Sequence, residues 1–365
     1  MTNNLTRAVG QKKGLHQNYN FIDVVKLVCA ALVVAIHVPP LTSVNWVLNF
    51  AVVNFISRIA VPFFFVSSAY FVFKKAYNTP DGKLDRSVIF AYIKKILRLY
   101  IIWSVIYAPF EYRNLLELSG GATVLQFLKY YIIKFIFSAS YGHLWYLNAV
   151  IVAYILLFLM LATDIKPAFI VCFSLLMYCI GLCAQSWFGF IEPLRQYPRL
   201  WSVLILPGKI FTTSRNGLCE GLLFVVIGRF FAVYDIRMKL KTAVICFAGS
   251  FMLFAAEVFT LFRLAWIREY DMFFGIVPTV FFLFYISLNI SLPNKKIYRK
   301  MRILSALIYF SHMIYVEILM LIPALQAMPG GGLTRYAFTL LFSLALSAGI
   351  VKLSGRFKLL NYLYR

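Results

Sequence analysis

Long apolar runs, separated by shorter polar and basic segments, fill almost the whole chain after residue 20. A helix of about 20 apolar residues crosses the hydrocarbon core of a bilayer, so we take runs of about 17–25 residues as spans. The pattern predicts an all-α polytopic membrane protein with about ten transmembrane helices in one bundle. The predicted spans are Phe21–Pro40, Val47–Phe73, Val88–Phe110, His143–Ala162, Ala168–Trp187, Asn216–Tyr234, Thr242–Phe262, Met272–Ser291, Ile303–Pro323 and Tyr336–Ser354.

One further run, Leu125–Phe137, is too short to cross a bilayer as a helix. Its core, QFLKYYIIKFIF, is aromatic and basic, a combination typical of helices that lie in the membrane interface. We expect an interfacial or re-entrant helix here, with an eleventh span as the alternative.

The composition supports the same class of protein. Of the 365 residues, 62% are hydrophobic and 13% are charged, which would leave a soluble domain too little polar surface to cover its core. The net charge of +23 would suggest nucleic acid in a soluble protein. Here the cations lie mainly between spans, so we expect membrane lipid and no nucleic acid as partner.

The six cysteines lie in apolar runs without a CxxC pair, and we expect them to be small buried hydrophobic residues that form neither disulfides nor a metal site.

The distribution of Lys and Arg among the loops predicts the orientation. More of these cations face the cytoplasm when both termini lie there, as the positive-inside rule requires. The predicted organisation is a cytoplasmic N-terminal tail (1–20), a membrane domain (21–355) and a cytoplasmic C-terminal tail (356–365). The N-terminal segment lacks an apolar signal core, so the first span is expected to remain part of the bundle. The expected location is a bacterial cytoplasmic (inner) membrane.

The first span carries Asp23, Lys26 and His37, although a charge inside a spanning helix costs about 2.5–3.5 kcal/mol. At about 100° per residue, the spacing of Lys26 and His37 places them within roughly 20° of one face and about 16 Å apart along the axis. Asp23 lies on that face one turn before Lys26, and we expect these two to form an ion pair. We expect the cation near the cytoplasm and the imidazole in the outer leaflet to face one common channel.

Basic residues in the next two spans have two interpretations. Arg58 in the second span either snorkels to the outer interface or has a function. Lys94, Lys95 and Arg98 in the third span are either positive-inside anchors or, together with Lys26, a pocket for an anionic ligand that enters from the cytoplasm.

Later spans hold further polar residues. His143 and Trp145 begin the fourth span, where such residues usually belong to the interfacial aromatic belt. Interhelical hydrogen bonding is the simplest account of His312 and Glu317 in the ninth span. Arg215, Asn216 and Glu220 lie around the outer end of the sixth span. Glu220 is one helical turn from Asn216, so we expect these two to form a polar notch. No P-loop, GxSxG, HExxH or Rossmann fingerprint appears, which argues against ATP hydrolysis, a serine hydrolase and a zinc enzyme.

These segments together resemble the acyltransferase-3 family of membrane proteins. Lys26 and His37 match the R-x10-H pattern of the family's first span, and Tyr309–His312 is similar to its late YxxH. Two residues depart from the pattern, because Lys26 stands in place of arginine and Ala69 in place of glycine. The other matching segments are RIAVPFFFVSSAYF (58–71) for RxxVPxFFxxSGY in the second span, KKILR (94–98) for the third and HLWYL (143–147) for the fourth.

The resemblance implies transfer of an acyl group, commonly acetyl from acetyl-CoA, to a hydroxyl of an extracytoplasmic glycan or related acceptor. No metal is expected. The resemblance implies that His37 acts as general base, a role that suits an imidazole with an ordinary pKa of about 6.5. Alternatively, His37 carries the acyl group itself. The acyl chain and the acceptor stay open, since acetyl, succinyl and longer chains are compatible. The competing interpretation is a transporter or flippase for a polar lipid or glycan, without chemistry.

The implied site falls into three groups of residues. The catalytic group is His37 with Asp23 and Lys26. The phosphates of acyl-CoA are expected at Lys94, Lys95 and Arg98, with Lys26 further along the donor. Residues implied for the acceptor or the oxyanion are Arg58, His143, Trp145, Arg215, Asn216 and Glu220. Further candidates, without an assigned role, are Tyr309, His312 and Glu317.

Overall fold

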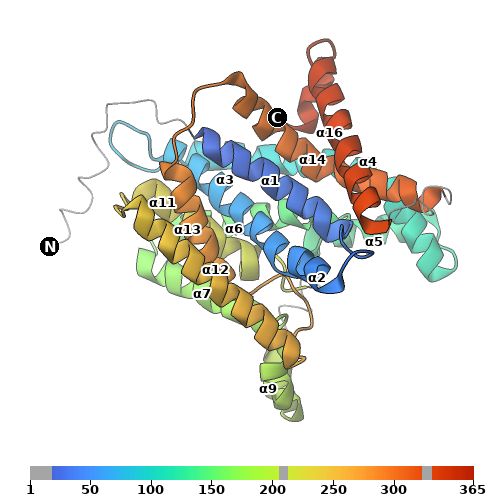
Figure 1. Cartoon of the computed structure of the whole chain (residues 1–365), viewed down its shortest axis with the longest axis horizontal. Coiled ribbons are helices and arrows are strands. Elements are labelled where there is room, and N and C mark those ends of the chain that lie inside the picture. The colour runs from blue at the N-terminus through green and yellow to red at the C-terminus, as the bar shows by residue number, and fades with distance from the viewer. Residues whose placement is uncertain (1–18, 205–212, 323–330) are drawn as a thin grey trace.

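The computed structural model describes residues 19–204, 213–322 and 331–365. Within these ranges every regular element is helical, and the helices form one bundle (Figure 1). The α-helices are α1 (Asn20–His37), α2 (Trp46–Asn54), α3 (Ala60–Ala76), α4 (Arg86–Ser119), α5 (Val124–Phe137), α6 (Trp145–Ala162), α7 (Pro167–Cys183), α8 (Phe188–Ile191), α9 (Pro198–Leu204), α11 (Leu222–Val233), α12 (Leu240–Arg263), α13 (Ile276–Asn289), α14 (Lys296–Leu321) and α16 (Gly331–Leu353). Short 3₁₀ turns are η2 (Ile56–Ile59), η3 (Gly142–Leu144), η4 (Glu192–Gln196) and η6 (Lys358–Leu363), and η5 (Gly217–Gly221) is a π-helix.

The predicted all-α membrane fold is confirmed, whereas the count of ten spans stays a prediction. Six helical stretches of the described chain are long and apolar enough to cross a membrane, or seven if the bent pair Pro167–Cys183 and Phe188–Gln196 is one span. The second predicted span is broken, because η2 separates α2 from α3. The helix expected at the interface forms as α5 and ends shortly before η3 and α6.

The centre of the bundle is built on the close approach of α3 and α11. A side chain at Gly228 of α11 would collide with the backbone of Val66 and Tyr70 and with the Cβ of Ala69 in α3. This contact includes Ala69, which stands where the family pattern has glycine. Around this pair, α1 packs between α3 and α14.

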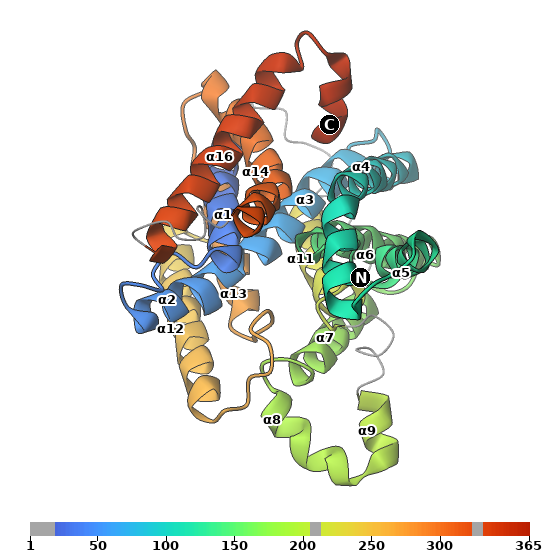
Figure 2. The same cartoon turned by 90° about the vertical axis from the view of Figure 1, so that its right-hand side faces the viewer.

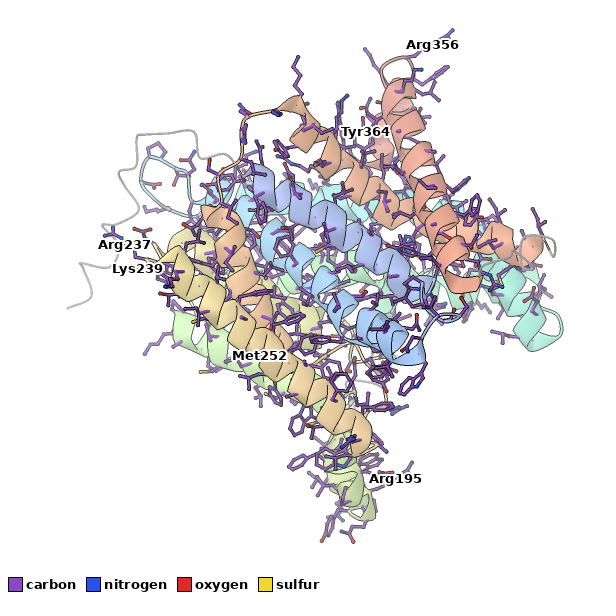
Figure 3. All side chains as sticks on the ribbon, viewed as in Figure 1. Arg195, Arg237, Lys239, Met252, Arg356 and Tyr364 are labelled. Atoms are coloured by element: carbon purple, nitrogen blue, oxygen red, sulfur yellow. The ribbon has the colours of Figure 1, made fainter. Side chains whose placement is uncertain are left out.

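The periphery is formed by α12 and α16, which expose most of their apolar side chains. Of the most apolar 18-residue window, 22% of the residues are buried in α12 and 17% in α16. Met252 on α12, which is 65% exposed, points away from the bundle (Figure 3). Such faces are those that lipid chains cover in a membrane. Figure 2 shows α8 and α9 projecting from the body of the bundle.

The predicted C-terminal tail is partly folded, because residues 358–363 form η6 against α4 and α16. The indole Nε1 of Trp103 donates to the backbone oxygen of Leu363 at 3.1 Å. The predicted N-terminal tail lies, apart from Tyr19 and Asn20, outside the described residues.

The cysteines follow the prediction only in part. All six are free thiols, and Cys29 and Cys219 are buried as expected. Cys172 is exposed, so its predicted burial is wrong. The reason is that α7 is apolar on its outer face as well, and an apolar residue on a membrane helix does not have to face the protein core.

Candidate active site

Three histidines from distant parts of the chain meet near the end of α1. His37 ends α1, His143 lies in η3 and His312 lies in the middle of α14. Their ring centroids are 5.1 Å apart for His37 and His312, 5.0 Å for His143 and His312, and 6.4 Å for His37 and His143. His143 and His312 are buried, whereas His37 is partly exposed. The structure therefore brings together the predicted base His37, His143 of the predicted acceptor group, and His312, a candidate without an assigned role.

Backbone carbonyls of α14 hold two of the three rings. The Nε2 of His143 lies 3.2 Å from the carbonyl oxygen of Phe310, and the Nδ1 of His312 lies 3.1 Å from that of Ile308. The hydroxyl of Tyr309 donates to the carbonyl oxygen of His143. The Nδ1 of His143 and the Nε2 of His312 are buried without a partner among the described residues. Each ring is thus fixed through one nitrogen and keeps the other free for a substrate or a proton.

An aromatic and charged wall supports His143 from α4. The ring of Tyr107 lies edge-on to His143 with centroids 4.8 Å apart and stacks on Tyr141 at 4.6 Å. The hydroxyl of Tyr141 donates to Glu317, which also accepts from Arg113 at 2.5 Å. The sequence marked neither tyrosine, because both lie in a chain with 23 tyrosines.

The interhelical bonding expected for the ninth span is confirmed for Glu317 and is wrong for His312. Glu317 joins α14 to Tyr141 and Arg113, whereas the hydrogen bond of His312 stays within α14. Five residues correspond to about 140° around a helix, so the two side chains project from different faces.

A charged cluster lies beyond the histidines, centred on Asp271 in the linker between α12 and α13. Asp271 accepts from Arg58 and, at 3.2 Å, from Nη1 of Arg215. The Arg58 and Asp271 side chains are only 11% and 15% exposed, so Arg58 does not snorkel into the interface. Burial alone would raise the pKa of Asp271, but Arg215 and then Arg58 hold it below its usual value. These charges also act electrostatically on His37.

The break between α2 and α3 positions Arg58. The Nε of Arg58 donates to the carbonyl oxygen of Val53 at 3.0 Å, and its Nη2 donates to Asn54 Oδ1 at 3.1 Å. Because η2 interrupts the helix at this point, a carbonyl near the end of α2 is available to the guanidinium. The sequence did not indicate Asp271, since an acidic residue next to a predicted span is an ordinary loop feature.

The predicted notch of Asn216 and Glu220 is wrong in its pairing. Asn216 caps η5, and its Oδ1 accepts from the backbone N–H groups of Leu218 and Cys219 at 2.9 Å each. Asparagine at a helix start commonly takes this role. Glu220 is 2% exposed, and its Oε2 has no partner in the described parts of the chain. Trp145 lies under Arg215, with the guanidinium carbon 4.9 Å from the ring centroid.

A cavity of about 640 Å³ opens on the other side of the histidines. Tyr309 and Phe310, the residues that hold His143, line it, and so do Lys26 and Lys95. His37 does not line this cavity, so the expectation that Lys26 and His37 face one open channel is wrong for this conformation. The ring of Tyr309, which lines the cavity, lies beside the other two histidines, with its centroid 5.8 Å from that of His143 and 6.3 Å from that of His312.

The expected ion pair of Asp23 with Lys26 is also wrong. Asp23 is 1% exposed and accepts from Nε and Nη2 of Arg302 at 2.8 and 2.7 Å. A guanidinium presents two parallel donors to a carboxylate, which an ammonium cannot do. Lys26 instead lies over the ring of Phe71, with Nζ 5.2 Å from its centroid.

The three basic residues of KKILR point in different directions. Lys95 lines the cavity with Lys26, whereas Arg98 donates to the backbone oxygen of Arg365 at 2.8 Å and lines a second basic cavity. Lys94 is exposed and belongs to neither. The segment therefore supplies one cation to each cavity and one to neither. Among the described residues, no three His, Cys, Asp or Glu side chains are arranged to hold a metal ion.

The comparisons with known proteins identify the family of the chain. The sequence model of the acyltransferase-3 family, described as an acyltransferase domain, matches residues 19–352. The chain therefore belongs to the acyltransferase-3 family. No solved structure matches it.

Three curated relatives carry another description. Two proteins named amino-acid racemase from Enterococcus faecalis are 26% and 28% identical over 75% and 82% of this chain. A serine/alanine racemase from Enterococcus gallinarum is 30% identical over 72% of it. The matched part is only 36%, 41% and 36% of these relatives, respectively. Their names therefore describe proteins of which this chain spans about two-fifths or less.

Proposed function

We propose that the chain is a membrane-embedded acyltransferase that moves an acyl group from cytoplasmic acyl-CoA to a hydroxyl of an extracytoplasmic glycan or related acceptor. Acetyl is the acyl group that we propose. The observation that carries the proposal is the histidine cluster between a basic cavity on one side and the cluster of Arg58, Arg215 and Asp271 on the other. Membership of the acyltransferase-3 family supports the reaction type.

The donor binds in the cavity of Lys26 and Lys95. Its phosphates are anions, and Arg299 and Arg302 add two further cations to the lining. The pantetheine arm then lies along the aromatic wall of Phe64, Tyr146 and Phe71, which also line the cavity. The thioester carbonyl reaches the histidines when Tyr309 moves aside.

The histidines carry out the transfer. His37 takes the proton of the acceptor hydroxyl while the oxygen attacks the thioester carbonyl. The carbon–sulfur bond breaks, the ester forms, and the thiolate leaves with a proton returned by the imidazolium. Acyl-imidazole formation on His37 is the alternative route. His143 and His312, each held through one nitrogen, position the reacting groups or pass the proton.

The acceptor is recognised on the far side of His37. Sugar hydroxyls require both donors and acceptors, which Arg215 and Glu220 provide, and Trp145 adds an aromatic surface. Glu220 is the strongest of these, because its buried Oε2 lacks a protein partner in the described structure and a buried polar atom is rarely left unpaired. Asn216 has a positioning role and does not contact the acceptor, since its side chain caps η5.

The test uses the full chain in lipid vesicles with labelled acetyl-CoA and a panel of acceptors. The panel contains cell-envelope glycans, lipid-linked sugars and, because the relatives are named amino-acid racemases, free serine and alanine. His37→Ala is expected to lower transfer by about 100-fold or more without changing donor affinity, because general acid–base catalysis contributes about 10²–10⁴. Undiminished transfer would remove His37 from the mechanism.

The donor cavity is tested separately by Lys95→Ala, with Lys94→Ala as its matched control on the same turn of α4. We expect only Lys95→Ala to weaken CoA binding, because Lys94 is exposed and outside both basic cavities. Equal losses would show that the cavity does not bind the donor. Movement of an acceptor across the vesicle without a change in mass would instead favour a transporter or flippase.

A further inference from the structure

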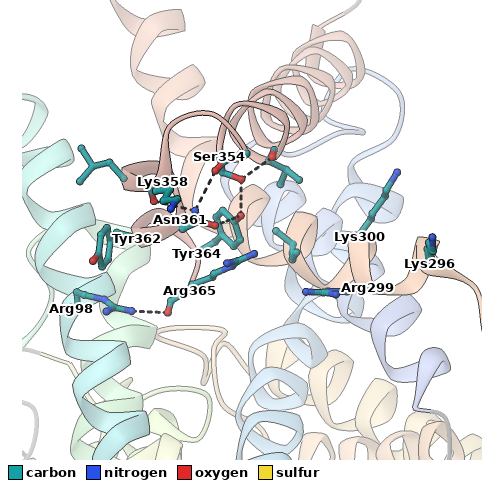
Figure 4. Close-up of a pocket in the computed structure, with 14 residues that line it drawn as sticks. Arg98, Lys296, Arg299, Lys300, Ser354, Lys358, Asn361, Tyr362, Tyr364 and Arg365 are labelled. Atoms are coloured by element: carbon teal, nitrogen blue, oxygen red, sulfur yellow. Dashed lines mark hydrogen bonds between the residues drawn. The ribbon is translucent and has the colours of Figure 1, made fainter.

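A second basic cavity lies where α4, the start of α14, the end of α16 and η6 meet (Figure 4). Its volume is about 950 Å³, and no Asp or Glu lines it. The cations that line it are Arg98, Lys296, Arg299, Lys300, Lys358 and Arg365.

No Asp or Glu side chain in the described parts of the chain pairs with these cations. None of the ion pairs between side chains there includes any of them. Arg98 is held by the backbone oxygen of Arg365 and lies over the ring of Tyr362, with the guanidinium carbon 5.0 Å from its centroid. Cations gathered around one cavity repel one another unless an anion compensates them. The lining therefore fits an anionic ligand.

The cavity adjoins the proposed donor cavity, with which it shares Arg299, Ile303, Tyr364 and Arg365. Tyr364 lines both and is 8% exposed. Its hydroxyl lies 2.9 Å from Ser354 Oγ and donates to Asn361 Oδ1 at 2.9 Å, a network visible in Figure 4. Lys26, Lys95 and Arg302 belong only to the donor cavity. Arg299 lines both cavities, whereas Lys296, Lys300 and Lys358 line only the second one and are left for another ligand.

The surroundings of the second cavity are those of a lipid site. The residues flanking its rim include Leu353, Phe357 and Leu359, which are 49%, 54% and 77% exposed. Helix α16, whose end forms one wall, is largely unburied along its length. A head group in the cavity would leave its acyl chains against these apolar side chains. Basic pockets between membrane helices on the cytoplasmic side are known to bind anionic head groups in this way.

We propose that this cavity binds the phosphate head group of an anionic membrane phospholipid, with the acyl chains along α16. The site joins α4, α14, α16 and η6, so an occupied cavity holds the C-terminal helices against the rest of the bundle. This proposal is independent of acyl transfer.

The test is native mass spectrometry of the full chain purified in detergent with phosphatidylglycerol or, in parallel, phosphatidylcholine. We expect preferential retention of phosphatidylglycerol by the unmodified protein. Lys300→Gln combined with Lys358→Gln should lower this retention about tenfold or more, because each cation near a head group contributes about 1 kcal/mol. The matched control is Lys239→Gln with Lys241→Gln, two exposed cations on the same predicted side, which should leave retention unchanged.

Three results would overturn the proposal. They are equal retention of the two lipids, equal losses in the control variant, and unchanged phosphatidylglycerol retention in the Lys300 and Lys358 variant. CoA titrated into the same variants distinguishes a soluble phosphate ligand, since a loss of CoA affinity with lipid retention intact would assign the cavity to the donor. Lys300→Arg with Lys358→Arg keeps both charges and should retain the lipid, which separates lost binding from lost folding.

Discussion

At the scale of single residues, the charged groups in this bundle are ordered by pairs that the sequence does not bring together. Asp23 and Lys26 are neighbours on one helix turn, yet Asp23 binds Arg302 on α14. Arg58 and Arg215 share Asp271, which the predicted spans left outside the membrane. A buried charge takes the partner with the best geometry, and that partner is set by helix packing. The relative placement of Lys26 and His37 could be predicted because both residues lie on one helix. The ion pairs of Asp271 and Arg302 could not, because their partners lie on other elements.

Asp271→Asn tests the outer pairs. It leaves two largely buried guanidinium groups without their carboxylate, which is expected to cost about 3–5 kcal/mol at neutral pH. Because the pKa of Asp271 is lowered in the folded protein, its stabilisation is fully present above the ordinary Asp pKa of about 3.9. That stabilisation is lost as the pH falls through the lower folded value. Thermal unfolding in detergent should show the two proteins converging only in acid.

The control for this variant is Glu117→Gln. Glu117 is 68% exposed and pairs with Arg113 at the surface, so its loss should change stability by less than about 1 kcal/mol. A difference between the unmodified protein and Asp271→Asn that is constant from neutral pH to acid would contradict the assigned pairing.

At the scale of elements, the pattern of apolar runs predicted the location of the main helices better than their interruptions. The break at η2 and the π-helix η5 both lie inside predicted spans, and both carry site residues, Arg58 and Glu220. Hydropathy does not report these breaks, because an interrupted helix and a continuous one have the same composition. Gly217 in NGLCEG is the local signal for η5, since a side chain there would collide with the carbonyl oxygen of Ala149 and with Val152.

Gly228→Ala tests the packing of α11 on α3. The added methyl group meets the backbone of Val66 and Tyr70, and backbone cannot move aside as a flexible side chain can. Overpacking of this kind typically costs about 1–3 kcal/mol. Gly249→Ala on α12 is the matched control, because nothing lies within 4 Å of its Cβ position, and the better helix propensity of alanine favours it by up to about 1 kcal/mol. Equal thermal stability of the two variants would show that the helices do not approach as closely as described.

At the scale of the whole molecule, the proposed chemistry depends on sidedness. The donor cavity at Lys26 and the outer cluster at Arg58 lie on opposite sides of the histidines, so the orientation in the membrane decides which of them CoA reaches. Arg237 and Lys239 lie near the start of α12, and Arg195 lies at the opposite end of the molecule (Figure 3). The positive-inside rule assigns the first end to the cytoplasm.

Single cysteines in two loops test this orientation directly. Lys83, whose side chain is 85% exposed, lies in the loop after α3, and Val44, 63% exposed, lies in the turn after α1. In a background with Cys172→Ala, which removes the exposed native thiol, an impermeant maleimide should label Val44→Cys in intact cells. It should label Lys83→Cys only after permeabilisation.

The reverse labelling would have a definite consequence for the mechanism. Lys26 and Lys95 would then face the exterior, where no acyl-CoA is made, and the basic cavity would not be a donor site. The cluster of Arg58, Arg215 and Asp271 would become the cytoplasmic entrance. Its two arginines share one carboxylate, so it would bind the phosphates of CoA far less well than the cavity of Lys26 and Lys95. The proposal of cytoplasmic donor and extracytoplasmic acceptor therefore stands only if Val44 is labelled from outside.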